Sequence, residues 1–354
     1  MVSPKIPATQ KAAQYHRSDN AIHINEIPVP KPLPTDLLVK TICSSLCRSD
    51  LMNFEPNDIG LKLESDVPVT LGHEAAGVIV SAGPECKGFK VGDEVGFLPA
   101  TNCCYECEGC QIHQMWCEKG CKMPGHAADG FFQEYIAVDW RNAIVLPAEL
   151  RAVEAAPLFC AGVTSYHGID DCRLAGLKEG EWMAIIGVGG LGHLGVQYAH
   201  AMGFKIIALD INDIQLEEAK ECGADYAINT RTDKDYVKKI KEITKGGCHA
   251  VVNYTNSKAA YESATDLLRI NGILMVVGLP QEPLSFNSMF IALRKFRVIG
   301  SSNKIPRLLP EFVDFSVKHG IKSKIAYYKL EQINEMIDLM KEGKFRGRVA
   351  VKFD

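Results

Sequence analysis

The sequence lacks any apolar run long enough to cross a bilayer, and it lacks an excess of one charge. Its longest apolar stretches, such as residues 273–279, have the length of a strand, whereas a membrane-spanning helix needs about 20 apolar residues. A formal net charge of −4 and a pI near 6.2 leave no basic field for nucleic acid or anionic lipid. Residues 1–10 contain no apolar core of a secretory signal. The expected location is therefore the cytoplasm.

Cysteine, by contrast, is abundant. The 354 residues include 13 cysteines, an odd number, and six of them fall between Cys103 and Cys121. In a chain without a secretory signal, clustered cysteines bind metal more often than they pair as disulfides. The length exceeds that of one ordinary domain and suits two, each large enough to bury a core.

The hydrophobic pattern changes near Gly180. Before residue 160, short strands alternate with turns, which predicts a β-rich half with strands at 37–42, 77–81 and 93–97. Beyond it, buried strands are predicted at 182–186, 204–209, 226–229, 250–253, 273–277 and 296–300. Helical patterns between them, clearest at 191–202 and 213–222, are typical of a parallel sheet built from βαβ units. The tail adds helical patterns at 306–319 and 330–342 and a strand at 348–352.

A glycine-rich turn, Gly187-Val-Gly189-Gly190-Leu191-Gly192, connects the first of these later strands to its helix. Gly187 permits the tight turn, Gly189 lets the backbone approach a pyrophosphate, and Gly192 lets the helix pack closely on the strand. The N–H groups at the start of the helix attract the phosphates. Asp210 stands where an acid accepts hydrogen bonds from the cofactor ribose, and its charge would repel a 2′-phosphate. The motif predicts NAD rather than NADP.

The cysteine cluster has the spacing of a metal site. Its four main ligand candidates are Cys104, Cys107, Cys110 and Cys117. Four thiolates with no room for water describe a closed, tetrahedral structural zinc site, and a loop so poor in apolar residues would draw its folding energy from the metal. Cys103 and Cys121 are competing ligands, and Cys121 in place of Cys117 stays open.

A second set of candidates is dispersed along the chain: Cys47 within Cys-Arg-Ser-Asp, His73 and Glu74 within Gly-His-Glu-Ala-Ala-Gly, and Cys160 within Cys-Ala-Gly-Val-Thr. Spacing alone does not unite them, because a lone buried cysteine is most often a small hydrophobe. Taken in order with the cysteine loop and the glycine turn, however, these motifs resemble the zinc-containing alcohol dehydrogenases of the medium-chain superfamily, in the yeast-type branch. The resemblance runs nearly end to end, from Ile27 to Arg348.

The resemblance implies an α/β protein of two domains. A GroES-like, β-rich catalytic domain would span residues 1–161 and 302–354, and a doubly wound Rossmann domain that binds NAD would span 162–301, with the active site in the cleft where they meet. A catalytic zinc on Cys47, His73 and Cys160 would keep its fourth position open for water or substrate. With the cysteine loop this makes two zinc ions per chain. The implied activity is hydride transfer between a primary or secondary alcohol and NAD.

Neighbouring residues take roles from the same resemblance. Ser49 would relay the alcohol proton, Asp50 would orient His73, and Glu74 would lie behind the metal. Contacts with the cofactor are implied for Arg48, Thr164, Gly187, Gly189, Gly190, Leu191, Gly192, Asp210, Val277 and Arg348. The two arginines in that set would bind the pyrophosphate, and a homotetramer is favoured over a dimer.

Three positions depart from the family pattern. Met52 stands where many of these enzymes have the histidine that ends the proton relay, and it cannot take a proton. The third and fourth cysteines of the loop, Cys110 and Cys117, are separated by six residues, where the family usually has seven. Pro99 falls where yeast-type enzymes have a bulky aromatic, which suggests room for secondary alcohols and larger ketones.

The sequence also has features that disfavour three other functions. A polyol dehydrogenase of the same superfamily tends to carry an acid in place of Cys160, so the cysteine favours simple alcohols. A zinc-free quinone or enoyl reductase would lack both the cysteine loop and the pair Cys47 and His73. A zinc module that binds nucleic acid or protein is disfavoured by the net acidity and by the complete glycine fingerprint.

Overall fold

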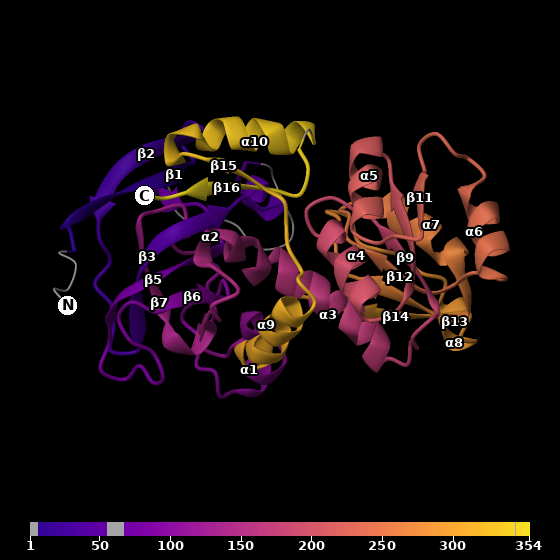
Figure 1. Ribbon diagram of the computed structural model, residues 1–354, viewed down its shortest axis with the longest axis horizontal. Coiled ribbons are helices and arrows are strands. Elements are labelled where there is room, and N and C mark those ends of the chain that lie inside the picture. The colour runs from indigo at the N-terminus through magenta and orange to yellow at the C-terminus, as the bar shows by residue number, and fades with distance from the viewer. Residues whose placement is uncertain (1–5, 55–66, 344) are drawn as a thin grey trace. The chain divides into compact units, whose positions relative to one another are not determined.

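The computed structural model describes residues 6–54, 67–343 and 345–354 (Figure 1). The chain divides into two compact units. The first comprises Met1–Cys160, Lys304–Val317 and Lys324–Asp354, and the second comprises Ala161–Asn303 and Lys318–Ser323. The last yellow strands and helix before the C-terminus in Figure 1 therefore lie beside the indigo N-terminal strands of the first unit.

Two β-sheets form the frame of the first unit. The smaller has the strand order β2-β1-β4 and antiparallel pairing. The larger, with seven strands, has the order β15-β16-β3-β5-β6-β8, and β7 also pairs with β3. The strands are β1 (Thr9–His16), β2 (Ala21–Pro28), β3 (Asp36–Ser45), β4 (Val69–Thr70), β5 (Ala75–Ala82), β6 (Glu94–Phe97), β7 (Tyr135–Asp139), β8 (Ala143–Val145), β15 (Ile325–Tyr328) and β16 (Arg348–Lys352).

The helices of the first unit include one with a clear apolar face. They are α1 (Glu108–Ile112), α2 (Ala152–Ala155), α9 (Leu309–Lys318) and α10 (Ile333–Glu342). In α10 the buried residues recur three and four positions apart, at Ile333, Met336, Ile337 and Met340, which is the spacing of one helical face. They share a core with Val349 of β16 and with Leu46, so the residue before Cys47 is anchored in that core.

The second unit is a doubly wound α/β domain. Its six strands are all parallel and have the order β11-β10-β9-β12-β13-β14, which is the strand order of dinucleotide-binding sheets. The strands are β9 (Trp182–Ile186), β10 (Lys205–Asp210), β11 (Tyr226–Asn229), β12 (Cys248–Asn253), β13 (Leu268–Val276) and β14 (Phe296–Gly300). The helices are α3 (Ala161–Leu174), α4 (Gly192–Ala201), α5 (Asp213–Glu221), α6 (Tyr236–Thr244), α7 (Lys258–Leu267) and α8 (Ser288–Ala292). The predicted fold class is confirmed.

The elements of the second unit follow the sequence pattern more closely than those of the first. β11 and β14 have the predicted bounds. β13 begins at Leu268 rather than at residue 273, because Leu268 already pairs with Cys248 before a shift of register. No helix among the residues that the structure describes is long and apolar enough to cross a membrane.

Candidate active site and metal centres

Cys47 stands between the end of β3 and a short 3₁₀ helix, Arg48–Asn53. Asp50 closes the first turn of that helix, since its carboxylate accepts a hydrogen bond from the Cys47 N–H at 2.9 Å. The other carboxylate oxygen of Asp50 lies 3.0 Å from Nδ1 of His73. Asp50 and His73 are both fully buried. One local turn therefore fixes Cys47 and orients His73.

His73 and Glu74 lie between β4 and β5, directly after a tight turn at Gly72. Gly72 has a φ of +96°, and a Cβ at this position would lie 2.8 Å from the ring of Phe132, so only glycine fits. Because a carboxylate only accepts hydrogen bonds, Nδ1 of His73 carries a proton, and in the neutral ring Nε2 is then an acceptor. Nε2 is buried and has no hydrogen-bond partner among the residues described. A metal ion would satisfy this lone pair.

Four potential ligand atoms converge at this point. The Cys47 and Cys160 sulfurs, a His73 nitrogen and a Glu74 carboxylate oxygen all lie within 4.8 Å of one another. A hydrogen bond from Cys160 lowers the pKa of Cys47 and raises that of Cys160. Two sulfurs and one imidazole are a donor set that suits zinc and leaves a fourth position for an exchangeable ligand.

Glu74 is held from behind by a buried cation. Its Oε2 accepts hydrogen bonds from the Ser45 hydroxyl and from the guanidinium of Arg348. Burial raises the pKa of Glu74 to about 7, and the charge of Arg348 opposes this rise. Oε1 is buried without a hydrogen-bond partner in the described part of the chain. Sequence reasoning missed Ser45 and this ion pair. The predicted contact of Arg348 with a pyrophosphate stays a prediction.

A second imidazole, that of His126, lies beside this cluster. Its ring centroid is 5.8 Å from that of His73. A ligand atom of His126, one of His73 and an oxygen of Asp50 lie within 4.8 Å of one another. Burial lowers the pKa of His126 to about 4. The sequence gives no signal for this residue, because a single histidine in a turn matches no metal or catalytic spacing.

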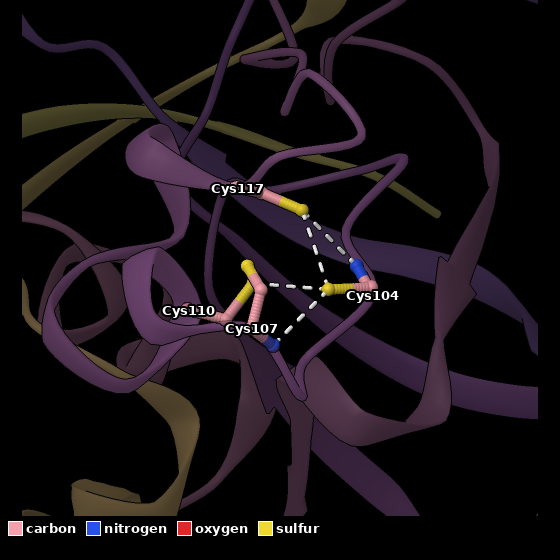
Figure 2. Close-up of side chains that lie close together, drawn as sticks. All are labelled: Cys104, Cys107, Cys110 and Cys117. Carbon is pink, nitrogen blue, oxygen red and sulfur yellow. Dashed lines mark hydrogen bonds between the residues drawn. The ribbon is translucent and has the colours of Figure 1, made fainter.

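The cysteine loop forms a separate cluster (Figure 2). The sulfurs of Cys104, Cys107, Cys110 and Cys117 all lie within 4.8 Å of one another. Backbone N–H groups support it, since the N–H of Cys107 donates to the Cys104 sulfur at 3.4 Å and the N–H of Cys104 to the Cys117 sulfur at 3.3 Å. Backbone hydrogen bonds lower the pKa of Cys104 to about 6. Cys121 is not in this set, and its thiol donates to the carbonyl of Lys122.

In the second unit, the glycine turn lies between β9 and α4. Gly187 has a φ of +80°, and a Cβ on Gly192 would lie 2.0 Å from the carbonyl oxygen of Gly187. A Cβ on Gly189 would meet nothing within 4 Å, which leaves open space at the glycine expected to face a pyrophosphate. At the end of β10, Asp210 accepts hydrogen bonds from three backbone N–H groups, among them that of Val188 in the turn at 2.9 Å.

The other predicted site residues have less distinctive surroundings. Ser49 is half-buried, and its hydroxyl oxygen lies 3.7 Å from the Cys47 sulfur. Arg48 is exposed. Thr164 is half-buried on α3, and Val277 is buried directly after β13. The glycine turn also contains Gly190 and Leu191, which are half-buried.

A doubly wound dinucleotide fold, a cysteine–histidine metal cluster and a four-cysteine cluster together define a zinc- and nicotinamide-dependent dehydrogenase. Comparison with known families agrees. The model of the alcohol dehydrogenase GroES-like domain matches residues 33–148, and that of the zinc-binding dehydrogenase matches residues 190–318.

Individual relatives cover almost the whole chain. An alcohol dehydrogenase of Geobacillus stearothermophilus is 37% identical over 345 residues, which are 97% of this chain and 100% of that protein. A second alcohol dehydrogenase from the same organism is 35% identical and covers 97% of this chain and 98% of its own length. The crystal structure of an alcohol dehydrogenase from the archaeon Aeropyrum pernix superposes with a TM-score of 0.87 at 29% identity, covering 97% of this chain and 100% of that chain.

The chain therefore belongs to the zinc-containing alcohol dehydrogenases of the medium-chain superfamily. It is an alcohol dehydrogenase that uses zinc and a nicotinamide cofactor and acts on small-molecule alcohols. Membership of the yeast-type branch stays a prediction.

Proposed function

We propose that the protein is a two-zinc, NAD-linked enzyme that transfers a hydride between a primary or secondary alcohol and NAD, with the catalytic zinc on Cys47, His73 and Cys160. The observation that carries this proposal is the convergence of ligand atoms from these three side chains, together with the unpartnered Nε2 of His73. Zinc bound there would supply a Lewis acid that polarises the alcohol oxygen and lowers its pKa. NAD at the glycine turn would supply the hydride acceptor.

The side chains of this site divide the remaining work. Ser49 accepts the proton of the alcohol, and Asp50 fixes the tautomer of His73. Arg348 neutralises Glu74 from behind, so that the carboxylate is tolerated next to two sulfurs. Met52 takes no proton, so the relay that begins at Ser49 ends at a group other than the side chain at position 52.

The finer assignments have separate support. The second zinc is assigned to Cys104, Cys107, Cys110 and Cys117, since these four sulfurs converge without Cys121. NAD is preferred over NADP because the Asp210 carboxylate ends β10, beside the glycine turn. Family likeness favours a homotetramer, and the clustered thiols favour the reducing cytoplasm.

A metal count on matched variants tests the proposal. Metal analysis of the purified protein should find about two zinc ions per chain, as expected for one catalytic and one structural site. Cys47→Ser and Cys107→Ser should each retain one zinc ion per chain. Cys47→Ser should lose activity but keep its thermal stability, whereas Cys107→Ser should lose thermal stability. Wild-type protein with alcohol dehydrogenase activity but a single zinc per chain, unchanged in Cys47→Ser, would refute the ligand assignment.

Cofactor preference is tested by kcat/KM with NAD and with NADP. Wild type should favour NAD, and Asp210→Ser should shift the ratio toward NADP by removing the carboxylate that repels a 2′-phosphate. Equal or better use of NADP by the wild-type enzyme would contradict the assignment of Asp210.

A further inference from the structure

The pairing of β12 with β13 is interrupted near the start of both strands. The two strands pair at Leu268 and again at Ile273, and between these points residues 269–272 of β13 stand opposite His249 alone. Asn271, within this bulge, has a φ of +63°, a left-handed conformation that few residues other than glycine adopt. Bulges redirect side chains and are common beside binding sites.

The bulge lines a cavity at the amino-terminal edge of the parallel sheet. Its volume of about 380 Å³ falls within the range of small-molecule sites, about 300–1,000 Å³. Glu181, which lines it, directly precedes β9. Three more lining side chains are each the second residue of a strand: His249 of β12, Arg269 of β13 and Arg297 of β14. The glycine turn follows the opposite, carboxyl end of β9, so the cavity is separate from the expected cofactor site.

Neither arginine of this cavity has a carboxylate partner in the part of the chain that the structure describes. The guanidinium of Arg297 is held by main-chain carbonyls, since Nε donates to Asn271 at 3.2 Å and Nη1 to Ala175 at 2.9 Å. Glu181 is the one acid among the described residues that line the cavity, and its Oε1 lies 3.4 Å from Nε2 of His249. Two guanidinium groups against one carboxylate leave an excess of positive charge.

The ring of His249 adds a donor to this excess. Its Nδ1 accepts a hydrogen bond from the N–H of Trp182 at 3.1 Å. Burial lowers the pKa of His249 below its ordinary 6.5, so the ring is neutral at pH 7 and its one proton lies on Nε2. The guanidinium of Arg269 also approaches Nε2, so two N–H groups face each other. Glu181 accepts from the ring, which leaves this N–H of Arg269 without an acceptor among the described residues.

We propose that this cavity binds a phosphate group, supplied by inorganic phosphate or by a small phosphomonoester. Guanidinium groups match the geometry of phosphate oxygens, and charge-assisted hydrogen bonds of this kind are the strong ones. A phosphomonoester presents three terminal oxygens, one for each donor group of Arg269, Arg297 and His249, whereas a carboxylate presents two. The anion also balances the excess positive charge. The inference does not depend on the proposed function, because none of these residues belongs to the metal clusters or to the glycine turn.

Calorimetric titration of the protein saturated with its nicotinamide cofactor tests the assignment, since the cofactor then occupies the other site expected to bind phosphate. Inorganic phosphate and glycerol 3-phosphate are titrated at constant ionic strength, and glycerol is the uncharged control. At least one of the two phosphates should bind, and glycerol should not. Tighter binding of glycerol 3-phosphate would assign the cavity to phosphomonoesters, and equal or tighter binding of inorganic phosphate would assign it to the free anion.

Variants of Arg269 show whether the bound phosphate lies in this cavity. Arg269 makes no described hydrogen bond to the main chain, so Arg269→Gln should fold normally. It should raise the Kd of the phosphate about 10-fold or more, the loss expected for one hydrogen bond to a charged group. Arg269→Lys keeps the charge but not the planar fork and should recover part of the affinity.

The matched control is Arg307→Gln, which removes an exposed arginine of the first unit and should leave the Kd unchanged. All three variants should keep the wild-type kcat/KM for alcohol, since the cavity is at the sheet edge opposite the glycine turn. The proposal is overturned if neither phosphate binds the wild-type protein, or if Arg269→Gln binds phosphate as the wild type does. An equal loss of affinity in Arg307→Gln would also overturn it, because the effect would then be one of overall charge.

Discussion

The hydrogen bond between Asp50 and His73 offers the sharpest test of the metal site. Asp50→Asn preserves the shape of the side chain but offers one acceptor oxygen where the carboxylate offers two. The amide oxygen of this variant can still accept from the Cys47 N–H, as the Asp50 carboxylate does at 2.9 Å. Its NH2 group then faces Nδ1 of His73, which lies 3.0 Å from the present carboxylate. This arrangement favours the ring tautomer with the proton on Nε2, the atom needed for the metal.

The magnitude follows from two independent considerations. Loss of a partner that orients a metal-bound histidine typically costs about 10- to 100-fold in metal affinity. A hydrogen bond to a charged buried group contributes about 1.5–3 kcal/mol, which converts to roughly the same range at 1.4 kcal/mol per tenfold. Because both side chains are fully buried, water cannot replace the lost bond. We therefore expect the catalytic zinc of Asp50→Asn to dissociate at a roughly 10- to 100-fold lower chelator concentration, within the typical range.

The assay is a chelator titration of the purified protein, read by the absorbance of the zinc complex. The structural zinc should be released at the wild-type chelator concentration, so the curve of Asp50→Asn should separate into two steps. Asp36→Asn is a matched control, because Asp36 is also buried and accepts a backbone hydrogen bond, from Leu33 at 2.9 Å. A single unshifted release curve for Asp50→Asn would refute the reasoning.

Three further outcomes are expected. Cys107→Ser should lower the Tm by about 5 °C or more, since a domain of this size loses about 2–4 °C per kcal/mol. Excess zinc should not restore the Tm of this variant. A melting curve like that of the wild type would contradict a structural metal at the cysteine loop. Gly189→Ala should raise the KM for NAD about tenfold, equivalent to roughly 1.4 kcal/mol of phosphate binding. Its Tm should not change, because the added Cβ enters open space. Gly192→Ala should lower the Tm as well, because its Cβ would lie 2.0 Å from the Gly187 carbonyl oxygen. The hydrogen bonds of Arg151 lower the pKa of Glu94 below its ordinary 4.5, so their stabilisation of the fold is present above that pH and is lost as the pH falls below it. Glu94→Gln should therefore flatten the acid limb of the Tm-versus-pH curve. Parallel curves for wild type and variant would disprove the contribution of this ion pair to stability.

How far the sequence predicts the fold depends on how regular each segment is. β11 and β14 have their expected bounds because each is a short apolar run between clear turn signals. β1 was not expected, since its sequence TQKAAQYH contains few residues with a strand preference. Its buried positions become apparent only when it pairs with β2 and β4. Long-range pairing of this kind leaves little trace in a local pattern.

How far the sequence predicts the site also depends on whether its residues are close together along the chain. The four cysteines of the loop are close in sequence, and their spacing alone predicted a metal cluster. Cys47, His73 and Cys160 were united only by family resemblance, because the turn at Gly72 and the ends of two other elements bring them together. His126 belongs to the site through packing of one turn on another, and no motif carries that information.

The packing around Gly72 links the orientation of a metal ligand, His73, to the position of the turn that carries His126. Its backbone precedes a metal ligand on one side and supports the turn bearing His126 on the other. A larger side chain at Gly125 or Gly130 would press on the carbonyl of Gly72 and thereby disturb the metal ligand that follows it. Changes near this metal site are therefore best tolerated as side-chain exchanges that leave that main-chain junction intact.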